Sequence, residues 1–118
     1  PWSREELILT LEFYIDHKGR IPDVKHPDVI ALASTLADLS MLDTDKGSNA
    51  GRERSSIIYK LANFRSLDPA ARSDGKKGFA NAGKLDREIW NEFSDDIVEL
   101  EKQAGEIREK IDNARDRF

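Results

Sequence analysis

The stretch RERSSIIYKLANFRSLDP, residues 52–69, combines positive charge with the periodicity of an amphipathic helix. It holds four Lys or Arg residues and two acidic residues. Ile57, Leu61 and Phe64 are spaced four and three residues apart, which places them on one face of a helix. The Asp-Pro pair at the end stops the helix, because a residue before proline is biased away from the helical region. The stretch therefore predicts a helix from about Ser55 to Phe64 or Ser66, with one buried face.

The other face of this helix and its surroundings carry side chains that suit DNA. Arginine can hydrogen-bond to guanine through two donors, asparagine can bond to adenine, and serine and lysine can reach phosphates. A core helix with an ordinary solvated face would show the same residue types, and this interpretation stays open. On the DNA interpretation, the contacting residues are Arg52, Arg54, Ser56, Tyr59, Lys60, Asn63, Arg65, Arg72, Lys76, Lys77 and Lys84.

The positive charge of the chain is concentrated around this helix. The net charge of the whole chain is −4. Residues 46–84 hold nine Lys or Arg against three Asp or Glu, a balance of +6, whereas the other residues hold ten against twenty, a balance of −10. Because patches rather than net charge decide where a polyanion binds, this segment is the predicted DNA side.

The loop AARSDGKKGFANAGK, residues 70–84, allows two interpretations. Its Lys and Arg side chains suit an arm that binds phosphates, with Phe79 stacking on a base or entering a groove. Alternatively, the loop is a solvated connection and Phe79 folds back onto the core. Both interpretations stay open.

Further helices are expected on either side. Ser3 and Glu6 form a predicted capping box for a first helix, Pro27 suits the first turn of a second, and residues 85–115 fit one long helix. The second helix has a predicted buried stripe of Val29, Leu32, Ala33, Leu36 and Leu39. We therefore predict an all-α domain of about four helices, with a helix-turn-helix-like core and a long C-terminal helix. The polar segment before the third helix exceeds the usual turn of about three or four residues, so the arrangement would be a variant.

Apolar residues recur along the C-terminal segment at the spacing of a coiled-coil seam: Phe93, Ile97, Leu100, Ala104, Ile107 and Ile111. Such a seam fits a dimeric coiled coil, an antiparallel return onto the chain's own domain, or a rigid arm. We expect the arm, with a homodimer as the next interpretation. The predicted division is a helical DNA-binding domain over residues 1–103 and an arm or dimerisation segment over residues 104–118.

Composition argues against several classes of function. A chain of 118 residues with 38% hydrophobic content fits one small domain. It contains no cysteine and two histidines: His17 beside Asp16 is too little for a metal site, and His26 before Pro27 suits a helix cap. No pairing of a nucleophile with a base stands out, so we expect no enzyme activity, no metal and no cofactor. No apolar run approaches the roughly 18–20 residues of a membrane span, and we expect a cytoplasmic protein.

Four stretches occur in an order that resembles a known family. They are WSREELILTLEFY (residues 2–14), HPDVIALASTL (26–36), SSIIYKLANFRSLDP (55–69) and GKLDREIWNEFSDD (83–96). Together they resemble the N-terminal domain that precedes the nuclease of McrA-type HNH endonucleases, which are bacterial modification-dependent restriction enzymes. The resemblance covers about residues 2–104. Members often carry Asn-Pro or Asn-Gly just before the third helix, where this chain has Glu53, Arg54, Ser55 and Ser56.

The resemblance implies a non-catalytic DNA-recognition module of a restriction–modification system, whose nuclease domain is absent from this chain. Its partner would be double-stranded DNA, methylated or otherwise modified, read through an apolar contact with a methyl group. The aromatic residues Trp2, Phe13, Tyr14 and Trp90 could line a pocket for such a base, although core packing is their commoner role. The alternative function is a helical dimerisation or protein-interaction module without DNA binding.

Overall fold

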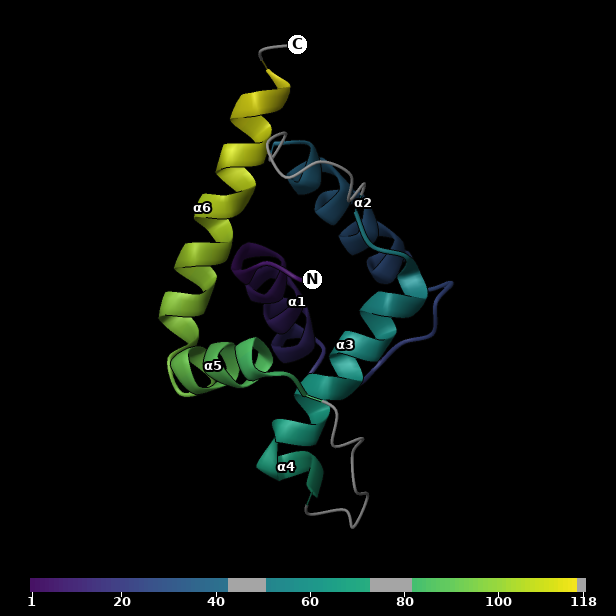
Figure 1. The fold of residues 1–118 in the computed structure, drawn as a ribbon, viewed down its shortest axis with the longest axis vertical. Coiled ribbons are helices and arrows are strands. Elements are labelled where there is room, and N and C mark those ends of the chain that lie inside the picture. The colour runs from purple at the N-terminus through teal and green to yellow at the C-terminus, as the bar shows by residue number, and fades with distance from the viewer. Residues whose placement is uncertain (43–50, 73–81, 117–118) are drawn as a thin grey trace.

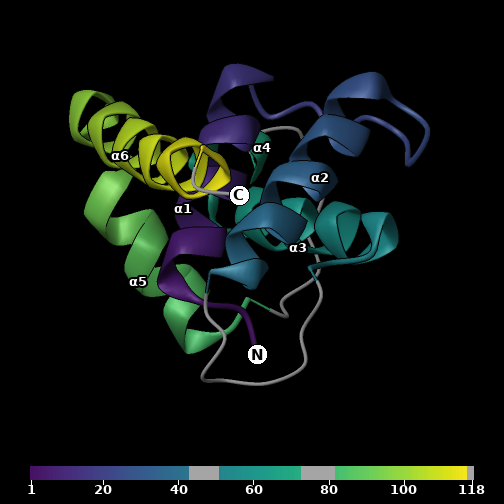
Figure 2. The ribbon, with the colours of Figure 1, turned by 90° about the horizontal axis from the view of Figure 1, so that it is seen from above.

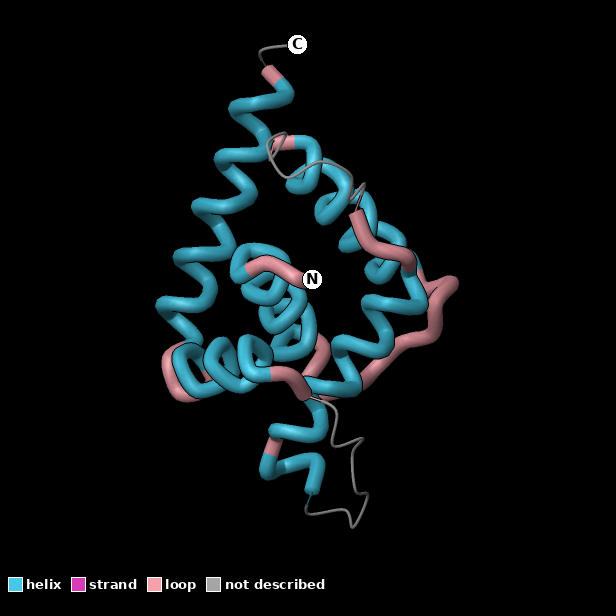
Figure 3. Tube along the Cα trace, viewed as in Figure 1, coloured by secondary structure: helices cyan, strands magenta, loops and turns pink. Residues whose placement is uncertain are grey.

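The computed structural model describes residues 1–42, 51–72 and 82–116 (Figure 1). All regular structure in these ranges is helical, which confirms the predicted all-α class (Figure 3). The described residues form six helices rather than about four, so the predicted number is wrong. They are α1 Arg4–Asp16, α2 Pro27–Met41, α3 Arg54–Leu67, α4 Pro69–Arg72, α5 Lys84–Phe93 and α6 Ile97–Arg115.

Helix α1 is the centre of the fold. It begins at the predicted capping box: the Glu6 amide donates to Ser3 Oγ at 3.2 Å, and the Ser3 amide donates to Glu6 Oε1 at 2.9 Å. Helices α2, α3, α5 and α6 all contact it, and Figure 2 shows it lying between the α2–α3 pair and the α5–α6 pair. Leu7, Leu9 and Leu11 are fully buried, although they do not share one face. This central position explains why burial extends around the helix.

Helices α2 and α3 form as their local sequence predicts. His26 is the N-cap of α2, and its Nδ1 accepts a hydrogen bond from the Asp28 amide at 3.0 Å. The predicted inner face of α3 is confirmed, because Ile57, Leu61 and Phe64 are all fully buried. Helix α3 nevertheless begins one residue before the predicted Ser55, with Glu53 as its N-cap.

The long C-terminal helix predicted over residues 85–115 is broken in two. Helix α5 ends at Phe93, and α6 starts after Asp96, whose carboxylate accepts a hydrogen bond from the Glu99 amide at 3.3 Å. Figure 1 shows the two helices meeting at a steep angle. Ser and Asp side chains favour helix ends because they can bond to backbone groups there. The spacing of the apolar residues continues across the Ser-Asp-Asp turn, so the sequence pattern did not indicate that the helix ends there.

Helix α6 returns onto the chain's own core. Leu100, Ala104, Ile107 and Ile111 are buried in the same cluster as the apolar residues of α1. The helix contacts both α1 and α2. Ion pairs flank the apolar contact: Lys110 with Glu5, Arg108 with Glu12, and Arg115 with Asp38. Of the three arrangements predicted for the seam, the structure has the return onto the chain's own domain, with α6 crossing α1 (Figure 2).

Candidate nucleic-acid interface

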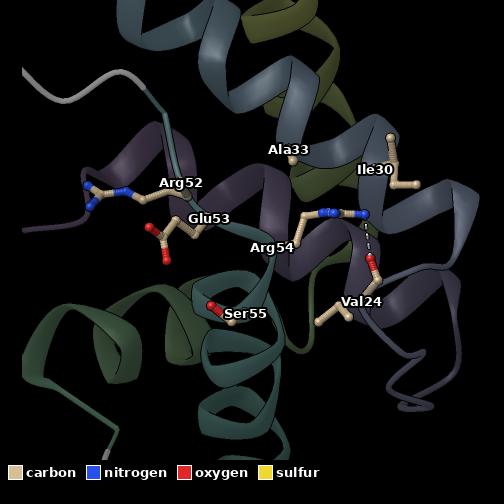
Figure 4. A pocket seen from close by; sticks show the side chains of 7 residues that line it. All are labelled: Val24, Ile30, Ala33, Arg52, Glu53, Arg54 and Ser55. Carbon is tan, nitrogen blue, oxygen red and sulfur yellow. Dashed lines mark hydrogen bonds between the residues drawn. The ribbon is translucent and has the colours of Figure 1, made fainter.

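An open groove lies where the start of α3 meets α2 and the connector between α1 and α2. Its volume is about 580 Å³, and Figure 4 shows the side chains that line it: Val24, Ile30, Ala33, Arg52, Glu53, Arg54 and Ser55. Two of these, Val24 and Ile30, are exposed apolar residues. The groove therefore places apolar surface beside charged groups at a helix N-terminus.

Arg54 projects across this groove. Its Nη1 donates a hydrogen bond to the backbone carbonyl of Val24 at 3.1 Å (Figure 4). The partner is neutral, and among the described residues Arg54 forms no ion pair with a carboxylate. Its positive charge therefore stays available at the groove, while the carbonyl restricts where the guanidinium can lie.

The N-terminus of α3 adds a second positive feature. Its N-cap is Glu53, whose side chain makes no capping hydrogen bond. The first amides of an α-helix lack partners within the helix and carry the positive end of its dipole. Ser55, in this first turn, is exposed. The start of α3 thus presents amides without helix partners beside Arg54, and the exposed carboxylate of Glu53 lines the same groove.

Arg52 faces the opposite way from Arg54 (Figure 4) and is held inside the fold. Its Nε donates to Glu6 Oε2 at 2.7 Å and its Nη2 to Glu6 Oε1 at 3.0 Å. The same Nη2 donates to the Pro1 carbonyl at 2.7 Å, and the guanidinium lies 4.9 Å from the centre of the Trp2 ring. Arg52 and Arg54 were both predicted to contact DNA, but their partners differ. Arg52 is paired with the carboxylate of Glu6, whereas Arg54 bonds only to a neutral carbonyl among the described residues.

The Arg52–Glu6 pair also changes the ionisation of the carboxyl group. Burial disfavours the charged form of Glu6, but hydrogen bonds from Arg52 and Ser3, together with the charge of Arg52, outweigh it and lower the pKa of Glu6. This pair ties the segment before α3 to the first turn of α1. Arg52 thus positions the start of α3.

Lys60 and Asn63 face α5 instead of solvent, so the outward orientation predicted for them is wrong. Lys60 Nζ lies 3.0 and 3.1 Å from the two carboxylate oxygens of Asp86, which is only 3% exposed. Asn63 is 4% exposed, and its Nδ2 donates to Asp86 Oδ2 at 3.5 Å. Helix α5 covers this side of α3. Helical spacing within α3 alone cannot show that a distant helix packs there.

The remaining predicted contacts are distributed around this surface. Tyr59 is exposed, Ser56 and Arg65 are partly buried, and the exposed Lys84 lies 4.0 Å from Glu88. Arg72 belongs to the single turn of α4. The predicted contacts of Lys76 and Lys77, and both interpretations of Phe79, lie outside the described residues.

The aromatic residues considered for a base pocket pack in the core. Tyr14 is buried, with its ring 6.0 Å from Trp90 and 6.5 Å from Phe64. Its hydroxyl donates to Asp68 Oδ2 at 2.7 Å, and burial together with this carboxylate raises the pKa of Tyr14. Trp2 lies against the guanidinium of Arg52. These rings therefore pack within the fold beside the groove and do not line it.

The groove residues Val24 and Ile30 were not among the DNA contacts predicted from the sequence. Ile30 lies one position after Val29, outside the buried stripe of α2. An apolar residue outside such a stripe was the signal in the sequence that could have indicated an exposed apolar site. Val24 lies in the connector between α1 and α2, which is not helical, so apolar periodicity cannot predict its exposure. Within the described ranges, no group of three His, Cys, Asp or Glu side chains could hold a metal ion, and no helix has the length and apolar character for a membrane span.

Comparison with family models, with curated proteins and with solved structures finds no match for this chain.

Proposed function

We propose that this chain is a non-catalytic DNA-binding domain that binds double-stranded DNA at the groove beside the start of α3. The observation that carries the proposal is Arg54, an arginine without an ion-pair partner among the described residues, held at a helix N-terminus beside apolar surface. Arginine is the commonest side chain to read guanine, and helix N-termini bind phosphate oxygens. Helices α2 and α3 would act as a helix-turn-helix variant with a long intervening segment.

The apolar part of the groove supports a preference for modified DNA. Val24 and Ile30 are exposed beside Arg54 and offer surface for a methyl group, as apolar side chains do for thymine. The resemblance to McrA-type domains favours the same reading, with the nuclease supplied by another part of a restriction enzyme. We therefore propose that Arg54 binds a guanine or phosphate while Ile30 contacts the methyl group of a neighbouring base.

The alternative, a dimerisation module, has less support. Its evidence was the apolar C-terminal seam, and the buried positions of that seam already contact the chain's own α1 and α2. A symmetric dimer that uses other surfaces would be compatible with DNA binding, since dimers double a half-site.

The test is fluorescence anisotropy with four duplexes, each at two salt concentrations. The duplexes are unmodified, cytosine-methylated, adenine-methylated and phosphorothioate-containing. We expect binding that weakens with salt, and tighter binding to one modified duplex. Arg54→Ala should weaken binding by roughly 5- to 150-fold, in line with about 1–3 kcal/mol for a good arginine contact.

Two further variants sharpen this test. Lys102→Ala removes the same charge from an exposed position on α6 and should leave affinity within about twofold. Ile30→Ala should reduce the preference for the modified duplex more than it reduces binding to the unmodified one. Equal affinities for Arg54→Ala and Lys102→Ala would refute the proposed interface.

A further inference from the structure

The indole ring of Trp2 lies against two cations that come from different parts of the chain. The guanidinium carbon of Arg52, in the segment before α3, is 4.9 Å from the centre of the ring. The ammonium nitrogen of Lys60, in the middle of α3, is 5.2 Å from the same centre. Both distances are within the roughly 6 Å at which an aromatic face attracts a cation, and tryptophan is the aromatic side chain that attracts cations most strongly. Trp2 therefore connects the start of α3 with its middle.

Each of these cations also pairs with a carboxylate from another helix. Arg52 pairs with Glu6 of α1, and Lys60 pairs with Asp86 of α5. The four charged side chains are between 3% and 15% exposed. Because water is largely excluded here, the attraction between a cation and the ring is stronger than at an exposed site. The ring thus joins two ion pairs into one cluster that spans α1, α3 and α5.

The backbone on either side of the ring contributes to the same cluster. The Pro1 carbonyl accepts a hydrogen bond from Arg52 Nη2 at 2.7 Å. The Ser3 amide donates to Glu6 Oε1 at 2.9 Å, and this oxygen also accepts from Arg52 Nη2 at 3.0 Å. The side chain of Arg52 is thus held by a carbonyl, a carboxylate and an aromatic face, all from the beginning of the described chain.

Helix α2 restricts the chain just before Arg52. Gly51 has a φ of +76°, and a Cβ atom at this position would lie 2.9 Å from the Cα atom of Ala37. The backbone therefore passes directly against α2, at a position that favours glycine. The next contact that could hold the start of α3 is its N-cap, but the Glu53 side chain makes no capping hydrogen bond. The contacts of Arg52 therefore carry much of the hold on the first turn of α3.

We propose that Trp2 is a positioning residue: through Arg52, its ring fixes the first turn of α3 and hence Arg54, the first residue of that helix. Trp2 does not line the groove, so its effect on the groove is indirect. Without the ring, Arg52 and Lys60 lose the aromatic partner that they share, and the first turn of α3 opens more often than the rest of the helix. The consequence for DNA rests on the proposed function, whereas the positioning of α3 does not.

Amide hydrogen exchange, followed by NMR, measures this opening at single residues. The Ile57 amide makes the first backbone hydrogen bond of α3, to the Glu53 carbonyl at 3.2 Å. The Leu100 amide makes the corresponding bond of α6, to the Asp96 carbonyl at 3.1 Å, and provides a matched control. Local opening of α3 accelerates exchange at Ile57 and not at Leu100, whereas global unfolding accelerates both amides by the same factor.

Two variants separate the aromatic face from the apolar bulk of Trp2. Trp2→Leu keeps an apolar side chain without the face, and Trp2→Phe restores a face. In Trp2→Leu we expect exchange at Ile57 to become roughly 5- to 30-fold faster, in line with the loss of a desolvated contact between a cation and a ring, with a much smaller change at Leu100. Trp2→Phe should recover most of the protection. Equal acceleration at both amides, no acceleration at Ile57, or equal exchange in the two variants would overturn the proposal.

DNA affinity provides the second readout. On the proposed function, Trp2→Leu should weaken binding several-fold and Trp2→Phe should weaken it less, although Trp2 lies outside the groove. The expected exchange pattern in a chain that binds none of the duplexes would refute the proposed function and support the positioning role of Trp2. Unchanged exchange at Ile57 in a Trp2→Leu chain that still binds DNA would refute only the role of Trp2.

Discussion

At the scale of single residues, the partner of a basic side chain decides what it can do. Arg52 and Arg54 are two positions apart in a basic stretch, yet Arg52 is paired with Glu6 and Arg54 bonds to a neutral carbonyl. Lys60, six residues further along α3 than Arg54, is paired with the buried Asp86. Pairing of this kind removes a charge from the surface, so the number of basic residues overstates the charge available to DNA.

The two arginines should therefore differ in their contribution to stability. Arg52→Ala leaves the buried carboxylate of Glu6 without its partner and should lower the free energy of unfolding by about 2–3 kcal/mol. Arg54→Ala removes an exposed side chain and should cost less than about 0.5 kcal/mol. Urea unfolding of both variants provides the comparison. Equal losses would contradict the internal role of Arg52.

The lowered pKa of Glu6 also predicts a dependence on pH. A carboxyl group whose pKa is lower in the folded chain stabilises the fold when it is ionised, which holds at neutral pH. This contribution is lost as the pH falls through the ordinary carboxyl range towards the lowered pKa. Glu6→Gln should be less stable at pH 7 and lose less further stability than the natural chain between pH 7 and pH 3. Chemical unfolding at a series of pH values measures this.

At the scale of elements, the break between α5 and α6 makes the C-terminal helix part of the core. A continuous helix would carry the residues after Phe93 away from α1. The turn at residues 94–96 sends α6 back, so that its apolar seam contacts α1 and α2. The same seam residues that fit a coiled coil thus find their partners within the chain.

Truncation of the α6 seam should destabilise the whole chain. Ile107 and Ile111 are buried against α1 and α2, and Ile→Ala in a core typically costs about 2–5 kcal/mol. Val98, on the same helix, is 79% exposed, and Val98→Ala should change stability by less than about 0.5 kcal/mol. Thermal unfolding of Ile107→Ala and Val98→Ala would show this contrast. An unchanged transition in Ile107→Ala would mean that α6 does not pack as described.

The N-terminus of α3 should respond to a better cap. Glu53 occupies the N-cap without a side-chain hydrogen bond, whereas serine at this position accepts one readily. Glu53→Ser should raise the free energy of unfolding by about 0.5–1 kcal/mol. Ser3→Ala, which removes an existing cap from α1, should lower it by a similar amount. Calorimetry of both variants tests the pair, and a destabilised Glu53→Ser would show that this glutamate has another structural role.

At the scale of the whole molecule, fewer positive charges are free of an ion pair, among the residues that the structure describes, than the sequence indicates. Each phosphate contact contributes about −0.9 to the slope of log affinity against log salt concentration. If Arg54 binds a phosphate rather than a guanine, Arg54→Ala should make this slope shallower by about one. Lys60→Ala should leave the slope unchanged, because Lys60 is already paired with Asp86. Anisotropy titrations over several salt concentrations measure both. A shallower slope for Lys60→Ala would show that this pair opens when DNA binds.

Much of the fold followed from local sequence chemistry. The capping box at Ser3, the cap at His26 before Pro27 and the inward face of Ile57, Leu61 and Phe64 depend on residues within a few positions of one another. Helix periods and caps are properties of such short stretches, so the sequence alone determined the all-α class and most helix positions. It also identified Arg54, although not the groove that the residue crosses.

Only the tertiary structure decided which charges face solvent and where the last helix lies. The pair of Arg52 with Glu6 joins residues 46 positions apart, that of Lys60 with Asp86 joins residues 26 apart, and that of Arg4 with Glu92 joins residues 88 apart. No periodicity within one helix encodes such partners, because they depend on how separate helices pack around α1. Of the four basic residues at residues 52–69, Arg52 and Lys60 are therefore held in pairs that join separate helices or segments, whereas Arg54 faces the groove.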